Sequence, residues 1–110
     1  ALHILKETII RNNQRFEFQG NVSDANFFKI FNFSLLKGDR NSALNEPNSI
    51  VISESLSQKL FANTEPINQM IQISDKGLYK VTGVLAKAPG KTHFQLEALL
   101  SASSNEKVST

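Results

Sequence analysis

The sequence predicts a mixed α+β domain, built from a sheet of about five to seven strands and two short helices. Runs of alternating or β-branched residues recur along the chain, separated by turn-forming residues, as is typical of strands. Two segments, 24–31 and 53–62, instead begin with a capping residue and carry apolar side chains at helical spacing. A chain of 110 residues with 40% hydrophobic and 20% charged residues fits one globular domain with its own core.

The first two expected strands form a hairpin. Residues 2–10 and 15–22 each alternate loosely between apolar and polar side chains, as half-buried strands do. The polar segment 11–14 lies between them and interrupts the alternation. An antiparallel pair joined by a short connection follows from this arrangement.

A helix with an aromatic face is expected next. Ser23 or Asp24 can accept a hydrogen bond from a free N–H group of the first turn and so cap the helix. Phe27, Phe28 and Phe31 then fall on one face. Half of the eight phenylalanines lie in or just after this segment, and burying each contributes about 1.5 to 3 kcal/mol. The segment is therefore expected to anchor the core.

Two extended segments are expected on either side of a polar connection. Residues 33–36 form the first, and a turn at Gly38 and Asp39 ends it. Residues 49–52 have the β-branched character of a buried strand and form the second.

The second helix is expected directly after that strand. Ser53 is a natural N-cap, and Glu54 lies in the first turn, where the helix dipole favours an anion. The helix should end near residues 62–63, because Pro66 forbids its continuation. Its apolar face is formed by Leu56, Leu60 and Phe61.

The last third of the chain predicts further strands. Residues 67–73 form a turn that leads into a strand, and residues 75–77 form a tight hairpin connection. Residues 78–85 return as a strand, in which Gly83 marks a bulge or a close backbone contact. Residues 94–100 resemble a strand but could be helical, so both alternatives stay open. The expected core comprises Phe27, Phe28, Phe31, Ile50, Ile52, Leu60, Phe61, Val81 and Val84.

Composition excludes several classes of protein. The net charge is only +2, and the basic residues are scattered instead of forming the patch that binds nucleic acid. Without cysteine, the chain has no disulfide, thiol nucleophile or Cys-ligated zinc. No apolar run exceeds three residues, whereas a membrane span needs about 20. Because the first residues show neither a charged leader nor an apolar core of the signal-peptide kind, we expect no signal peptide here, and we expect the chain to be a piece of a larger protein.

The spacing of reactive residues indicates no catalytic or metal-binding motif. His3 and His93 each lack a second histidine at i+3 or i+4, so surface histidines are the simpler interpretation. Ser53, Ser55 and Ser57 match no nucleophile motif and are better explained as a cap and a helix surface. The glycines form neither a dinucleotide fingerprint nor a phosphate loop.

Acidic side chains are spread over separate expected elements, which favours solvated surface over a working pair. The acids in question are Glu46, Glu54, Glu65, Asp75 and Glu97. We therefore expect no catalytic residue, no metal ligand and no bound cofactor, and we do not expect an enzyme.

Several segments, in order and with their spacings kept, resemble the extracytoplasmic core domain of MacB/FtsX-like ABC transporter permeases. The resemblance covers about residues 15–101. Within it, Glu65-Pro66-Ile67-Asn68-Gln69 is similar to a D/E-P-I-G-K segment of that family, with Asn68 where the family often has glycine. The segments that carry the resemblance are 24–31, 33–39, 46–56, 59–61, 65–69, 79–85 and 93–97.

The resemblance implies a fragment of the MacB-like periplasmic core domain over residues 1–101, followed by a polar tail at 102–110. In that family the domain lies between the first two transmembrane helices, on the far side of the inner membrane from the ATPase. The implied role is non-catalytic: the domain relays ATP-driven movement to an exported substrate or periplasmic partner, in export, lipoprotein release or cell-wall regulation. The implied partners are the permease's own transmembrane helices and, across the membrane, the ATPase.

An alternative from another class is an extracytoplasmic ligand-binding or sensory module. Its exposed loops, 38–48 or 86–92, would grip a small molecule or a peptide. A bound ligand or a deep, partly apolar pocket would favour this alternative.

Overall fold

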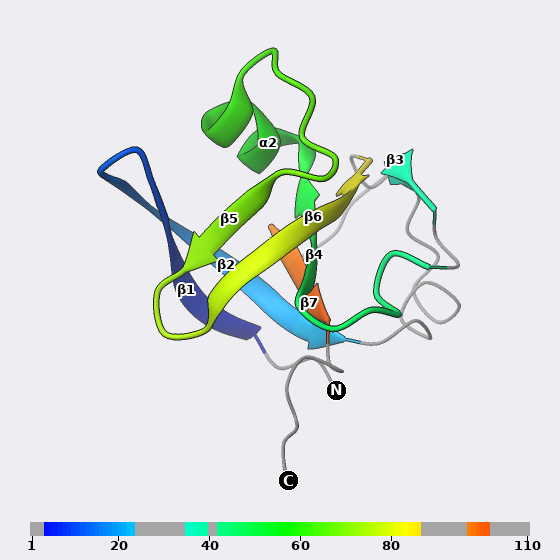
Figure 1. The fold of residues 1–110 in the computed structure, drawn as a ribbon, viewed down its shortest axis with the longest axis horizontal. Coiled ribbons are helices and arrows are strands. Elements are labelled where there is room, and N and C mark those ends of the chain that lie inside the picture. The colour runs from blue at the N-terminus through cyan, green and yellow to red at the C-terminus, as the bar shows by residue number, and fades with distance from the viewer. Residues whose placement is uncertain (1–3, 24–34, 40–41, 87–96, 102–110) are drawn as a thin grey trace, which may run out of the picture.

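The computed structural model describes residues 4–23, 35–39, 42–86 and 97–101 (Figure 1). Within these residues the chain forms seven strands and one helix. In chain order they are β1 (Ile4–Arg11), β2 (Gln14–Ser23), β3 (Leu35–Gly38), β4 (Ser49–Ser53), α2 (Glu54–Phe61), β5 (Met70–Ile73), β6 (Gly77–Leu85) and β7 (Ala98–Ser101).

The strands form one mixed sheet that closes on itself. Its order is β3-β6-β4-β7-β2-β1-β5, and β5 also pairs with β6, so six strands form a ring to which β3 is attached. The β2–β7 and β4–β6 pairs are parallel, and the other pairs are antiparallel. In Figure 1 the β5–β6 pair lies in front of β1, β2 and β7, and α2 lies above them. A closed ring lets the strands enclose a core between them.

The predicted N-terminal hairpin is confirmed, with a shorter connection than the sequence suggested. β1 and β2 pair antiparallel up to Arg11↔Gln14, so only Asn12 and Asn13 join them. These asparagines have φ of 54° and 66°. Positive φ at both central residues gives the two-residue turn that matches strand twist, and asparagine tolerates this conformation better than most residues. The outer residues of the polar segment therefore belong to the strands.

The second predicted hairpin, between β5 and β6, is also confirmed. Ile73 pairs with Gly77 across a three-residue connection, and the backbone N–H of Lys76 donates to the carbonyl of Ile73 over 3.0 Å. Gly77 has φ of 94°, a conformation that residues with a Cβ adopt only at a cost. The glycine thus allows the chain to re-enter the sheet.

The predicted strand-to-helix unit is confirmed at β4 and α2. Ser53 has extended backbone angles, and its hydroxyl accepts a hydrogen bond from the N–H of Leu56 over 3.1 Å. Glu54 occupies the first turn and Ala62 ends the helix. The side chains of Leu56, Leu60 and Phe61 are buried, as their spacing predicted.

Buried side chains lie on both faces of the sheet. The inner cluster lies inside the ring and under α2, and comprises Ile9, Phe18, Ile50, Ile52, Leu56, Leu60, Phe61, Ile71, Ile73, Tyr79, Val81, Val84, Ala98 and Leu100. The outer cluster comprises Ala43, Leu44, Val51, Leu85 and Leu99, with Leu35 packed against it. The predicted core residues Ile50, Ile52, Leu60, Phe61, Val81 and Val84 are all buried.

The prediction of a mixed sheet is confirmed, and the count of strands reaches the upper end of the expected range. The described part contains one helix, where the sequence suggested two. The other expected helix, with Phe27, Phe28 and Phe31, falls outside the described residues, as does the tail 102–110. At the C-terminal end of the uncertain segment 94–100, residues 98–101 form the strand β7, and the helical alternative is wrong there.

Candidate functional site

β6 is the strand at which the most elements of the described part come together, because it pairs with three other strands. One edge of β6 pairs with β4 over residues 80–85. Along its other edge, β5 pairs with residues 77–80 and β3 with residues 83–85. The gap between β5 and β3 is filled by a turn, since Val81 accepts from the N–H of Asn68 and donates to the carbonyl of Gln69, each over 2.9 Å.

That turn spans residues 65–69, the segment in which asparagine replaces the glycine of the similar family motif. The N–H of Gln69 donates to the carbonyl of Pro66 over 3.1 Å, and Asn68 has φ of 72°. A positive φ at the third residue of a turn is typical of type II, where glycine or asparagine is favoured. Asn68 therefore keeps the geometry that glycine would allow.

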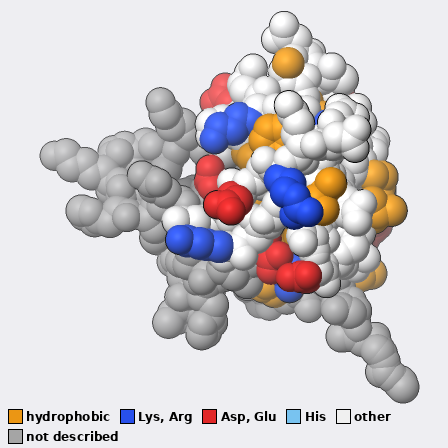
Figure 2. Space-filling model, turned by 90° about the vertical axis from the view of Figure 1, so that its left-hand side faces the viewer, with side chains coloured by type: hydrophobic (Ala, Val, Ile, Leu, Met, Phe, Trp, Pro, Cys, Tyr) orange, Lys and Arg blue, Asp and Glu red, His pale blue; other side chains and the backbone are white. Residues whose placement is uncertain are grey.

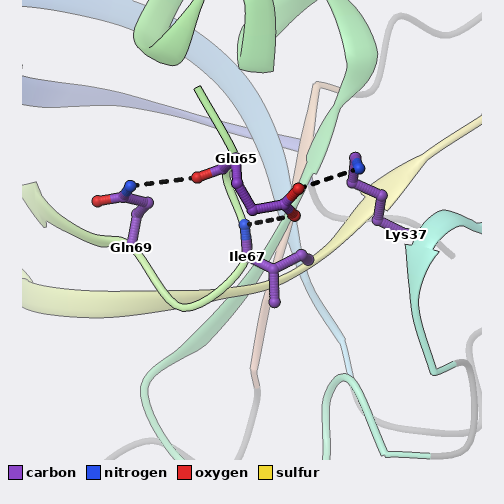
Figure 3. A network of polar contacts seen from close by, with 4 residues as sticks. All are labelled: Lys37, Glu65, Ile67 and Gln69. Carbon is purple, nitrogen blue, oxygen red and sulfur yellow. Dashed lines mark hydrogen bonds and ion pairs between the residues drawn. The ribbon is translucent and has the colours of Figure 1, made fainter. Parts of the chain in front are cut away.

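The carboxylate of Glu65 links this turn to β3 (Figure 3). One oxygen accepts from Nζ of Lys37 over 3.2 Å, and the other accepts from the N–H of Ile67 over 3.4 Å. The side chains of Lys37 and Glu65 are 47% and 59% exposed, and an ion pair so exposed contributes about 0.2 to 1 kcal/mol. The contact positions β3 beside the turn more than it stabilises the fold.

Thr82 and Gly38 make close contacts in the C-terminal half of β6, where it pairs with β3 and β4. The β4–β6 register shifts between Ile50 and Val51, so Thr82 lies in a bulge next to Gly83. This confirms the predicted bulge. The hydroxyl of Thr82 donates to the carbonyl of Ala43 over 2.7 Å. A Cβ on Gly38 would collide with the carbonyl oxygen of Thr82.

The acids and serines that could carry chemistry are placed apart, in structural roles. Ser53 caps α2, Glu65 holds the turn, and the carboxylate of Glu97 accepts from the N–H of Gln19 over 2.9 Å. His3 and His93 lie outside the described residues. Among the residues that are described, no group of three or more His, Asp or Glu side chains could hold a metal ion.

One loop of the ligand-binding alternative is partly built into the fold. In the segment 42–48, Ala43 and Leu44 are each only 2% exposed and belong to the outer cluster. Residues 87–92 of the other loop lie outside the described residues. The side of the ring seen in Figure 2 carries Lys and Arg side chains beside Asp and Glu, with hydrophobic side chains between them.

Three long-range contacts could not be read from the sequence. They join Lys37 to Glu65, Thr82 to Ala43 and Arg11 to the carbonyl of Leu60. The one local signal was Asn68, since asparagine in place of a family glycine points to a residue with positive φ.

The described part of the chain is a closed mixed sheet with one helix packed against it. The family model of the MacB-like periplasmic core domain matches residues 3–109, and the chain belongs to that family. It is a periplasmic domain of a MacB-like ABC transporter permease. The resemblance seen in the sequence is thereby confirmed.

Solved structures share the fold. A domain assigned to a permease of Porphyromonas gingivalis is 24% identical with a TM-score of 0.73, and covers 94% of this chain and 44% of its own. The extracellular domain of the noncanonic ABC-type transporter YknZ from Gram-positive bacteria is 17% identical with a TM-score of 0.71. The match covers 93% of this chain and 52% of the YknZ domain. The periplasmic region of MacB from Actinobacillus actinomycetemcomitans is 17% identical with a TM-score of 0.66. The match covers 94% of this chain and 47% of the MacB region.

The chain thus spans about half the length of these solved relatives, between 44% and 52%. A comparison with curated proteins finds no significant match. Within the described residues, no helix has both the length and the apolar character that crossing a bilayer requires.

Proposed function

We propose that this domain is a non-catalytic relay in an inner-membrane ABC transporter permease. It passes ATP-driven movement of the transmembrane helices to a substrate or a partner outside the membrane. Its direct partners are the helices of the same permease, and the ATPase acts on it across the membrane. Residues 1–101 form the body and residues 102–110 a polar tail.

The observation that carries this proposal is the closure of the sheet. The ring through β5 and β6 links strands from both ends of the chain, and one inner cluster draws residues from β1, β2, β4, β5, β6, β7 and α2. A close-packed interior resists deformation. A body built in this way moves as a unit, which hinge and shear mechanisms require.

Two measurements on the full-length permease test the proposal, and the first is a distance within the domain. The chain has no cysteine, so Gln58→Cys on α2 and Asp75→Cys in the β5–β6 connection, both exposed positions, can carry spin labels after other cysteines are removed. Labelled subunits are diluted with unlabelled ones. The distance within the domain is then compared between nucleotide-free and vanadate-trapped permease.

The second measurement reports movement against the membrane. A fluorophore at Gln58→Cys is quenched by spin-labelled lipid headgroups in the same two nucleotide states. We expect the distance within the domain to stay constant and the quenching to change. Quenching that is equal in both states, or a domain whose internal distance changes with nucleotide, would contradict a rigid relay.

A further inference from the structure

The outer face of the sheet is covered on only one side of the ring. Over β4, β7 and the end of β6, the outer cluster and residues 42–45 pack on it. Over β1, β5 and the beginning of β6, no described residue forms a comparable layer. There, Met70 is 48% and Leu78 54% exposed, whereas large apolar side chains are mostly buried in a domain of this kind.

The register places these residues next to one another. Ile10 pairs with Gln72, and Gln72 pairs with Leu78, so the three side chains form a row on the outer face. Met70 pairs with Lys80 in the adjacent row, which makes Met70 a diagonal neighbour of Leu78. We call the four residues Ile10, Met70, Gln72 and Leu78 the outer β5 face.

Cations flank the outer β5 face at both ends. Arg15 pairs with Ile10 on the β2 side, and Lys80 lies on the β4 side. Neither takes part in a salt bridge among the described residues. The nearest acid by register is Glu17, two residues along β2 from Arg15 and exposed. Asp75, in the exposed β5–β6 connection, is a second acid near the row, and Lys76 beside it pairs with Glu7 over 3.8 Å. The charges near the row are thus balanced in number, but the two cations lie at its two ends, whereas Glu17 and Asp75 both lie to one side, toward the β5–β6 connection.

We propose that the outer β5 face binds an apolar polypeptide segment flanked by acidic residues, carried by a partner outside the membrane. Leu78, Met70 and Ile10 supply the apolar contact, and methionine adapts to irregular surfaces. Arg15 and Lys80 attract the acidic flanks. Gln72, in the centre, offers an amide donor and acceptor that match a peptide backbone and have no counterpart in a lipid chain. This inference rests on the proposed function, in which the domain acts on a substrate or a partner outside the membrane.

The test uses the full-length permease in maltoside micelles and two fluorescein-labelled peptides. One alternates leucine with glutamate, and the other alternates leucine with lysine. Leu78→Asp is compared with Leu36→Asp, because both leucines are 54% exposed and Leu36 lies on β3, away from this face. Binding is followed by fluorescence anisotropy, with empty micelles as the blank.

We expect the glutamate peptide to bind the wild type, and Leu78→Asp to weaken it at least about tenfold while Leu36→Asp changes it less than about twofold. Lys80→Glu should weaken the glutamate peptide and strengthen the lysine peptide, a gain that misfolding cannot produce. Equal binding to the Leu78→Asp and Leu36→Asp proteins would overturn the proposal. So would release of the glutamate peptide by phosphatidylglycerol added to the micelles, which would assign the face to anionic lipid.

The two proposals fail separately. If the peptide does not bind but headgroup quenching still changes with nucleotide, the relay stands and the outer β5 face has another role. If the peptide binds as expected and quenching does not change, the face stands and the relay is wrong.

Discussion

Arg11, the last residue of β1, lies over the ring of Phe61 at the end of α2, with 4.5 Å between the guanidinium carbon and the ring centroid. Its Nε also donates to the carbonyl of Leu60 over 3.0 Å. A cation at the C-terminus of a helix satisfies a free carbonyl and interacts favourably with the helix dipole. One side chain thus ties the helix to the far end of the first hairpin.

Replacing Arg11 with alanine should lower the free energy of unfolding by about 1 to 2 kcal/mol, because a charged hydrogen bond and a cation–π contact are lost together. Urea denaturation of the 110-residue chain measures this. Arg15→Ala is the matched control, since Arg15 is exposed on β2 and should leave the midpoint nearly unchanged. Equal losses in both variants would show that the contact with α2 contributes nothing.

Substitutions at Gly38 and Gly77 distinguish the cost of backbone strain from the cost of a steric collision. Both have positive φ, 95° and 94°, but a Cβ on Gly77 would meet nothing within 4 Å, whereas one on Gly38 would collide with the carbonyl oxygen of Thr82. Gly77→Ala should cost about 1 to 2 kcal/mol from strain alone. Gly38→Ala should cost a further 1 to 3 kcal/mol or so, because β3 and β6 must separate. Equal urea midpoints for the two variants would refute this account of Gly38.

Asn68 tests whether the turn of residues 65–69 needs a positive φ. Asn68→Ala should lower the free energy of unfolding by about 1 kcal/mol, since alanine pays for the left-handed conformation. Asn68→Gly should stay within about 0.5 kcal/mol of the wild type, because the ease of adopting positive φ offsets the greater freedom of the unfolded chain. If alanine and glycine behaved alike, the φ of 72° would not be what selects the residue.

The placement of the domain outside the cytoplasm, in a protein of the inner membrane, can be checked by labelling. Asp75→Cys, in the exposed β5–β6 connection, should react with a membrane-impermeant maleimide in intact spheroplasts, and the labelled protein should sediment with the membrane fraction. A cysteine introduced into the ATPase serves as the control and should react only after lysis. Protection of Asp75→Cys until lysis would contradict the proposed topology.

Local patterns determined most of the elements in the described part. Ser53 and Glu54 begin α2 where capping and dipole arguments place them. The β-branched run of β4, residues 50–52, is fully buried, and Gly83 marks the bulge in β6. These features depend on neighbours in sequence, or on the simple alternation of a strand, so a single chain contains the information. The resemblance to the permease family rested on the same local segments, and the family match confirms it.

The tertiary structure decided what those elements enclose. The hairpin of β5 and β6 was predicted from its connection, but nothing local indicates that β5 also pairs with β1 and so closes the ring, or that Lys37 meets Glu65 across 28 positions of chain. The outer β5 face likewise exists only because register brings Ile10, Gln72 and Leu78 into one row. Periodicity shows which side of a strand is apolar, but the pairing of distant strands depends on the free energy of the whole packed core, which no short segment contains.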